Sequence, residues 1–220
     1  MTTHALILAG ETLIARPSGA LHWPAQGLLC VSDLHFGKSV RAARHGGTLL
    51  PPYETEDTLT RLDADLEAVG ATRVICLGDS FDHRDGAGEM AEPHRLWLLR
   101  MMAGRDWTWI AGNHDPAPLG LGGSDLAALT LGPLTFRHIA ERGAVGEISG
   151  HYHPKARLGG RARPCFLADA ARLILPAFGT YTGGLWCHDP AFDALMGPRA
   201  TAILTGSRTM VLPRSTARVP

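Results

Sequence analysis

Short apolar runs that end in glycine or a polar residue recur along the chain and predict buried β-strands. They cover residues 28–31, 74–77 and 107–111, and the stretch 145–149 also reads as a short buried strand. Runs of this length with such boundaries are typical of strands within a sheet. Further strands are predicted at 5–8, 11–15, 20–23, 126–131, 134–137, 164–167, 172–175, 200–204 and 209–212, with a tight hairpin turn at Gly10-Glu11.

Helical spacing appears in two segments between these strands. Leu59, Leu62, Leu66 and Val69 form one apolar stripe behind a first turn rich in acidic residues, which favour the positive end of a helix dipole. A helix is therefore predicted to begin near residue 54 and to end at Gly70. A second helix is predicted over 93–102 and a short basic one over 38–45, while 82–92 and 116–124 are predicted to be loops.

Strands lie early and late in this order, and strands alternate with helices in the middle. The pattern predicts an α/β fold in which two mixed β-sheets pack face to face with helices outside, a four-layer α-β-β-α sandwich. A chain of 220 residues, 45% hydrophobic and 19% charged, has the size and composition of one globular domain. We expect a single domain over 1–220, with 213–220 as a loose tail.

The charge balance leaves the partner open. The chain has 21 basic and 21 acidic residues and a formal net charge of zero, so it lacks the basic excess common in duplex-binding proteins. Zero net charge does not exclude nucleic acid, because carboxylates committed to metal ions count as negative although the metals offset them.

The cysteines and the absence of long apolar runs bear on location. Cys30, Cys76, Cys165 and Cys187 are widely spaced without a C-x-x-C motif, and we expect all four to be reduced, as in a cytosol. No apolar run approaches the length of a membrane span, and the N-terminus lacks the pattern of a signal peptide. A cytoplasmic protein without a membrane partner is expected.

Residue types that bind metals stand directly after four of the predicted strands. They are Asp33-Leu34-His35, Gly78-Asp79, Gly112-Asn113-His114-Asp115 and Gly150-His151-Tyr152-His153. Open α/β sheets bind ligands at the carboxyl ends of their strands, so these groups should meet at one edge. An H-x-H pair alone is weak evidence in a chain with eleven histidines, but the four strand ends together predict a metal site.

The ordered set of Asp-x-His, Gly-Asp, Gly-Asn-His-Asp, a single His and Gly-His-x-His resembles the motif set of the calcineurin-like metallophosphoesterases over residues 30–154. Segments 34–38, 47–53 and 173–184 are similar to one subgroup, the ligase-associated DNA-damage-response endonucleases of bacteria. The resemblance implies a dinuclear-metal-dependent phosphodiesterase or endonuclease acting on DNA during repair. It also implies association with a DNA ligase, a helicase and an exonuclease.

The resemblance also implies the ligands of two divalent metal ions. Asp79 would bridge them, Asp33, His35 and His153 would complete the first site, and Asn113, His138 and His151 would complete the second. His138 is the least specific assignment, because it is a lone histidine between Asn113 and His151. Mixed oxygen and nitrogen ligands without thiolate favour Mn²⁺, with Fe or Zn as alternatives. Two metals about 3.5–4 Å apart generate a bridging hydroxide and clamp the phosphate.

His114 is expected to be the catalytic residue that does not bind metal. As a cation it would stabilise charge on the phosphate or protonate the leaving oxygen, and Asp115 could orient it and raise its pKa through a hydrogen bond. The family often has glutamate at position 115 and an arginine where this chain has His83 followed by Arg84. This departure leaves open which of His83 and Arg84, if either, touches substrate.

Other candidates have plainer explanations. Lys38 could contact a nucleic-acid backbone together with Arg41 and Arg44, but a solvated basic face fits these residues about as well. Asp82 is interpreted as orienting its loop rather than as a ligand. Ordinary roles are also expected for residues outside the motifs: core packing for Trp107 and Trp109, and surface or hydrogen-bonded positions for His4, His22, His45, His94 and His188.

Two other functions compete with the nuclease interpretation. A phosphoesterase for nucleotides or other small phosphoesters would need a closed pocket with an aromatic clamp, whereas a polymer needs an open, basic approach to the metals. A non-catalytic metal-dependent scaffold in a repair complex would have no need of His114, so the intact motif set argues against it.

Overall fold

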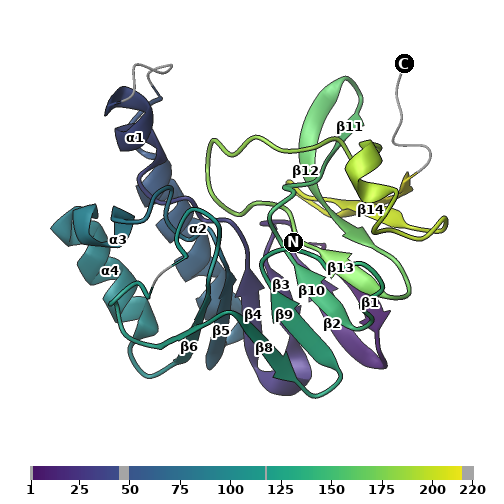
Figure 1. The fold of residues 1–220 in the computed structure, drawn as a ribbon, viewed down its shortest axis with the longest axis horizontal. Helices are drawn as coiled ribbons and strands as arrows, with labels where there is room; N and C mark the ends of the chain where they lie inside the picture. The colour runs from purple at the N-terminus through teal and green to yellow at the C-terminus, as the bar shows by residue number, and fades with distance from the viewer. Residues whose placement is uncertain (1, 45–49, 117, 215–220) are drawn as a thin grey trace.

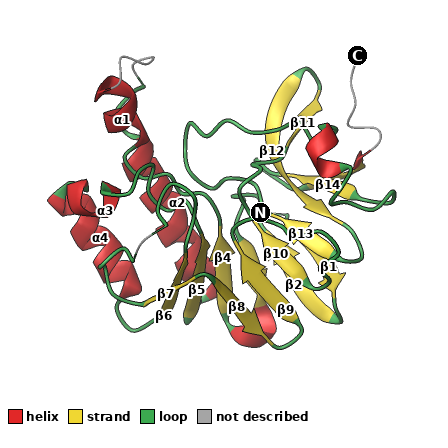
Figure 2. Cartoon of the chain, in the orientation of Figure 1, coloured by secondary structure: helices red, strands yellow, loops and turns green. Residues whose placement is uncertain are grey.

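The protein is described by a computed structural model that covers residues 2–44, 50–116 and 118–214 (Figure 1). Two β-sheets pack face to face, and the α-helices lie together against the outer face of one of them (Figure 2). The expected α/β class with two mixed sheets is confirmed. The predicted tail beyond residue 214, His45 and the segment 47–49 lie outside the described residues.

The first sheet contains seven strands in chain order: β1 (His4–Leu8), β2 (Glu11–Ala15), β3 (Leu21–Trp23), β4 (Leu28–Val31), β5 (Arg73–Leu77), β6 (Asp106–Ile110) and β7 (Ser124–Leu126). Strands β1 to β4 are antiparallel neighbours, and β4 to β7 are parallel. Because Leu8 pairs with Glu11, the β1–β2 turn falls at Ala9 and Gly10, one residue before the predicted turn. Both turn residues have positive φ, 49° and 86°, as in a type I′ hairpin.

The second sheet has the order β15-β14-β12-β13-β10-β9-β8, with β11 paired to β12. Its strands are β8 (Ala128–Leu131), β9 (Leu134–Arg137), β10 (Glu147–Ser149), β11 (Lys155–Leu158), β12 (Arg161–Ala168), β13 (Arg172–Ile174), β14 (Thr201–Leu204) and β15 (Met210–Pro213). Only β9, β10 and β13 are parallel neighbours. The hairpin of β11 and the first half of β12 was not predicted from the sequence.

The two long predicted helices are confirmed as α2 (Glu54–Val69) and α4 (Glu92–Met102), and the short basic helix is α1 (Lys38–Arg44). Helix α3 (Gly86–Glu89) occupies part of the stretch predicted to be a loop. The stripe of α2 is buried: Leu59, Leu62 and Leu66 pack in one cluster with β5 and β6 of the first sheet. Gly70 ends the helix in the left-handed conformation, with φ of 60°.

Three apolar clusters account for the layers. One lies between the helices and the first sheet, where Trp107 and Trp109 are buried as predicted, and another lies between the two sheets. A third covers the outer face of the second sheet, and there the cover comes from irregular chain around the short 3₁₀ turn η2 (Pro190–Phe192), including Cys187, Phe192 and Met196. Among the described residues, this outer layer is formed by irregular chain and a 3₁₀ turn, where an α-helix was expected.

All four cysteines are free and buried, and burial raises the pKa of each thiol, as expected of inert core residues. Across the described ranges, the helices are too short or too polar for any of them to span a bilayer.

Candidate metal centre

The predicted metal ligands meet where the parallel strands of both sheets end. Backbone hydrogen bonds tie the loops together: the amide of Asp33 donates to the carbonyl of Gly78 (3.2 Å), and that of Gly150 donates to the carbonyl of His138 (3.0 Å). The amide of His151, from the second sheet, donates to Oδ2 of Asp33, from the first, at 2.9 Å. One loop network therefore joins the carboxyl edges of the two sheets.

Asp33, His35 and His153 form the first group of converging ligand atoms, all within 4.8 Å of one another. Oδ2 of Asp33 accepts hydrogen bonds from Ser32 Oγ and the amide of His151, whereas its Oδ1 makes no hydrogen bond and lies 3.0 Å from Nε2 of His153. Nε2 of His35 and Nε2 of His153 are also buried without a hydrogen bond. Buried polar atoms almost always have hydrogen-bond partners, so three such atoms that converge without hydrogen bonds fit a bound cation.

Asp82 fixes the ring of His35. Its Oδ1 lies 3.0 Å from Nδ1 of His35, which leaves Nε2 to face the group, as outer carboxylates commonly do for metal-binding histidines. The same carboxylate pairs with Arg41 at 3.1 Å and lies 3.8 Å from Lys38, both on α1. Burial opposes ionisation, yet His35, Arg41 and Lys38 lower the pKa of Asp82. From the sequence, Asp82 was expected to orient its loop; its carboxylate instead contacts the ring of His35 and forms, with His35 and His114, a further group of converging ligand atoms.

Asp79, His138 and His151 form the second group. Nδ1 of His138 lies 2.8 Å from the carbonyl of Leu77, and because a carbonyl only accepts, the ring proton must sit on Nδ1. Nε2 lies 2.9 Å from Asn113 Oδ1, 3.2 Å from His151 Nδ1 and 3.5 Å from Asp79 Oδ2. These neighbouring atoms are electron-rich, so a positive charge belongs at their centre.

The carboxylates and imidazoles of this site shift one another's pKa values. Burial lowers the pKa of His138, but the Asp79 and Asp33 carboxylates outweigh it and the net pKa is raised. Burial and the nearby His138 lower the pKa of His151. The pKa values of Asp33 and Asp79 are both lowered, because their histidine neighbours outweigh the effect of burial. A proton on His138 and a metal cation would compete for one lone pair.

Backbone strain is concentrated at the predicted ligands. Seven non-glycine residues of the described chain have positive φ, and five of them are predicted ligands: Asp33 (53°), His35 (47°), Asp79 (46°), His151 (70°) and His153 (46°). Such a conformation costs about 1–3 kcal/mol for each residue and persists only where the surroundings enforce it. The loops are therefore held in the shape that brings the side chains together.

The glycines of the motifs leave room for this arrangement. A Cβ on Gly78 would lie 2.5 Å from Nδ1 of His138, and one on Gly150 would lie 1.7 Å from Oγ of Ser32. A Cβ on Gly112 would lie 2.2 Å from the amide nitrogen and from Oδ1 of Asp79. In each Gly-Asp, Gly-Asn and Gly-His pair, the second residue is a predicted ligand. The glycine before it has no Cβ and so leaves space for a neighbouring loop.

His114 lies beside the second group, but Asp115 does not orient it as expected. The Asp115 carboxylate accepts from the backbone amides of Asp79 (2.9 Å), Phe81 (3.1 Å) and Gly112 (3.1 Å), and burial raises its pKa. The ring of His114 is held by the carbonyl of Asp82, 3.0 Å from Nδ1, and its Nε2 lies 3.9 Å from Asp79 Oδ2. Asp115 instead joins the β5 and β6 loops.

The three residues expected to contact substrate differ in placement. Lys38 is at the site, beside Asp82. His83 turns toward Glu89, with 3.3 Å between Nε2 and Oε2, and Arg84 is exposed. Asn113 is exposed, with its amide oxygen directed at His138.

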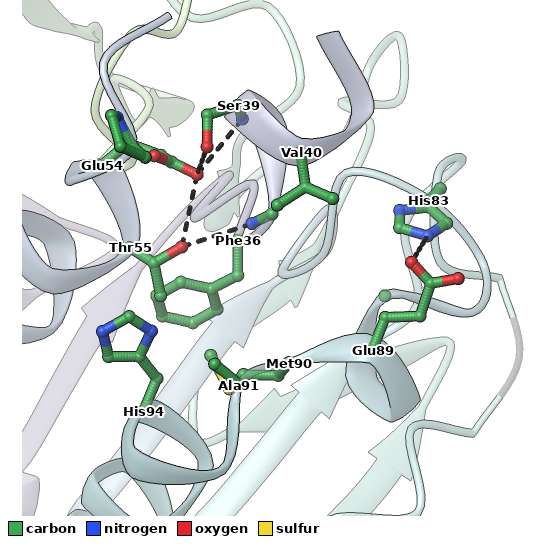
Figure 3. Close-up of a pocket in the computed structure, with 13 residues that line it drawn as sticks. Phe36, Ser39, Val40, Glu54, Thr55, His83, Glu89, Met90, Ala91 and His94 are labelled. Atoms are coloured by element: carbon green, nitrogen blue, oxygen red, sulfur yellow. Dashed lines mark hydrogen bonds and ion pairs between the residues drawn. The ribbon is translucent and has the colours of Figure 1, made fainter. Parts of the chain in front are cut away.

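Two hollows lie near the metal centre. One of about 230 Å³ has Phe36, Val40 and Met90 in its wall, and the Glu54 carboxylate in it accepts from the amide and hydroxyl of Ser39 (Figure 3). None of the predicted ligands lines it. The other, of about 260 Å³, is lined by the ligand His153 together with cationic side chains of the β11–β12 hairpin.

The fold and the site define a class: a two-sheet α/β sandwich whose strand ends carry buried Asp and His groups that could hold metal ions. Neither a protein-family model nor a curated protein sequence matches the chain. Among solved structures, it is similar to the crystal structure of Pseudomonas putida nuclease MPE, with a TM-score of 0.75 and 29% identity. The alignment covers 96% of this chain and 100% of the other.

Proposed function

We propose that the protein is a metal-dependent nuclease that hydrolyses phosphodiester bonds, with DNA as its substrate. The observation that carries the proposal is the orphaned set of ligand atoms at the joined strand ends, in a fold similar over its whole length to a nuclease. Buried carboxylates and imidazoles without partners are costly unless a cation is bound there, which supports a metal centre over a structural role.

Two divalent cations fit the two groups. Asp33, His35 and His153 would hold one, and His138, His151 and Asn113 would hold the other, with Asp79 between them. When bound, such a pair supplies Lewis acidity to the attacking water and to the phosphoryl oxygens. We propose Mn²⁺ as the metal, with Fe or Zn as alternatives, because the donors mix oxygen and nitrogen without sulfur.

His114 is proposed to handle the proton on the leaving oxygen. The carbonyl of Asp82 keeps a proton on Nδ1, so Nε2 is the nitrogen free to face substrate. About a third of the side chain is exposed, which allows contact with a polymer. When the ring carries a proton on both nitrogens, Nε2–H donates to the departing oxygen, and the neutral ring then recovers a proton from solvent.

Lys38 is proposed to face the phosphate backbone at the same edge, where Asp82 steadies its ammonium group. The hollow that contains His153 is lined by basic residues, as a polymer substrate requires, whereas the 230 Å³ hollow has no predicted ligand in its wall. These observations favour a nuclease over a phosphoesterase for small molecules. The role in repair and the association with a ligase, a helicase and an exonuclease stay predictions from the resemblance.

The test is Mn²⁺-dependent cleavage of single-stranded DNA, duplex DNA and a small chromogenic phosphodiester. Asp79→Asn and His114→Ala should each abolish DNA cleavage, while His94→Ala, outside the centre, serves as the matched control. Hydrolysis of the small diester alone would keep the metal centre and reject the polymer substrate. Metal binding without cleavage of any substrate would favour the scaffold.

A further inference from the structure

A hairpin rich in cations begins two residues after the predicted ligand His153. Strands β11 and β12 carry Lys155, Arg157, Arg161 and Arg163, and the sequence from 154 to 168 contains no acidic residue. The hairpin rises above the second sheet on the side where α1 rises above the first (Figure 1). In a chain with equal numbers of basic and acidic residues, this is a local concentration of positive charge.

These four cations lack carboxylate partners among the described residues. Elsewhere in the described chain, basic side chains near acidic ones form ion pairs, such as Arg172 with Glu147 at 2.9 Å and Arg16 with Asp65 at 2.7 Å. Like charges gathered without counter-charges repel one another and attract polyanions. The positive charge of the hairpin is therefore not paired with acidic side chains among the described residues.

Trp186 holds two of these cations in place. Lys155 and Arg157 are two residues apart on β11, so they share one face of the strand. Nζ of Lys155 lies 4.8 Å from the centroid of the indole ring, and Cζ of Arg157 lies 5.1 Å from it. The ring is also stacked with His188, at 6.2 Å between centroids and 12° between planes. Two long side chains are thereby kept together over one rigid platform.

The hairpin is continuous with the metal centre. The lining of the hollow of about 260 Å³ includes His153 together with Lys155, Arg163 and Pro164 of the hairpin. The segment that contains Gly184 also lies directly against His153, because a Cβ on Gly184 would lie 1.9 Å from the carbonyl oxygen of His153. A strand cut at the metals could therefore run straight onto the basic hairpin.

We propose that the β11–β12 hairpin is a nucleic-acid-binding arm that holds the phosphate backbone of the strand leaving the metal centre, with Trp186 positioning Lys155 and Arg157. The inference rests on the proposed function and adds to it a binding site for the substrate strand outside the metal centre. Cationic contacts to phosphates fix the register of a strand without reading its bases, so binding is independent of sequence.

The test measures binding without catalysis. The full-length protein in EDTA is titrated against a fluorescein-labelled single-stranded oligonucleotide, and anisotropy is followed from 0.05 to 0.5 M salt. The variants are Lys155→Gln/Arg157→Gln and Arg161→Gln/Arg163→Gln. The matched control, Arg95→Gln/Arg199→Gln, removes two exposed charges from α4 and from the end of the second sheet opposite the hairpin.

Each phosphate contact contributes about 0.7 to the slope of log K against log salt for single strands, so losing two should flatten the slope by about 1.4. At 0.1 M salt this corresponds to binding about 25-fold weaker, relative to a 1 M reference. The control variant should bind like the wild type. Trp186→Ala should flatten the slope in part, and Trp186→Phe, which restores a ring under the cations, should recover it.

Three outcomes would overturn the inference: hairpin variants that match the control in affinity and slope, a wild type that does not bind the oligonucleotide, or a Trp186→Phe variant that behaves like Trp186→Ala. Unchanged thermal melting confirms that the variants are folded. The proposed function fails separately, when the metal-loaded wild type hydrolyses the small diester but cleaves no nucleic acid. Binding through the hairpin would then still be measured in EDTA.

Discussion

Asp82 offers a sharp test of how the metal centre is supported. Its carboxylate lies 3.0 Å from Nδ1 of His35 and converges with His35 and His114 in a third group, apart from the two groups of predicted ligands. Arg41, its other close partner, is 44% exposed, so water can replace a lost contact there. The side chain of His35 is only 3% exposed, so nothing replaces the carboxylate that fixes its ring.

The expected loss of metal affinity follows from the burial of His35, where water cannot replace the carboxylate. Loss of the outer partner of a metal-binding histidine lowers metal affinity about 10- to 100-fold, which is about 1.4–2.7 kcal/mol. Asp82→Asn keeps an oxygen that can accept from Nδ1–H and should fall near the lower figure. Asp82→Ala removes the acceptor and should fall near the upper one.

The assay is isothermal titration calorimetry with Mn²⁺ on metal-free protein. Asp85→Asn is the matched control, because Asp85 is exposed and makes no side-chain hydrogen bond at the start of α3. If both Asp82 variants bind Mn²⁺ as tightly as the control, the ring of His35 does not need this carboxylate and the reasoning is refuted. Equal losses in Asp82→Asn and Asp82→Ala would refute the graded hydrogen-bond argument alone.

Three further predictions address packing, protons and backbone shape. Phe192→Ala, in the irregular outer layer, should lower the free energy of unfolding by about 3–5 kcal/mol in urea, since the ring is fully buried, whereas exposed Leu96→Ala should change it by less than about 0.5. Mn²⁺ affinity measured by calorimetry should fall as the pH drops through the raised pKa of His138, beginning above 6.5, because the proton occupies the lone pair that the metal needs. Gly78→Ala should weaken metal binding severely, because its Cβ would collide with His138, while Gly88→Ala, with open space around it, should bind normally.

Each of these has a contrary result. A Phe192→Ala protein as stable as the wild type would mean that the outer layer contributes little to the fold. Mn²⁺ affinity that stays flat between pH 8 and 6 would mean that the metal does not compete with the ring proton. A Gly78→Ala protein with unchanged affinity would show that the loop can relax without moving His138.

The predictions from sequence succeeded where one residue pattern implies one geometry. The apolar runs before Asp33, Gly78 and Gly112 fit only buried strands, and parallel strands carry their last residues to one edge, so the meeting of these groups was foreseeable. The apolar face of α2 was equally predictable, because its leucines recur with the period of an α-helix.

Other features left little trace in the sequence. The partner of His114 is a backbone carbonyl, which any residue at position 82 would supply, so the sequence directed attention to the Asp115 carboxylate instead. The β11–β12 hairpin alternates arginine and lysine with small apolar residues around Gly159-Gly160, a usable but weak hairpin signal that competes with a basic loop. The outer layer around Phe192 has no period at all, because irregular chain covers that sheet.

The division of the ligands between the two sheets has a consequence for how the protein matures. Asp33, His35 and Asp79 come from loops of the first sheet, whereas His138, His151 and His153 come from the second. The first group is complete only after residue 153 has been synthesised and the second only after residue 151, and each needs the two sheets to have docked. On the proposed function, occupancy of both groups would be a late step in biosynthesis and would mark the assembly of both halves.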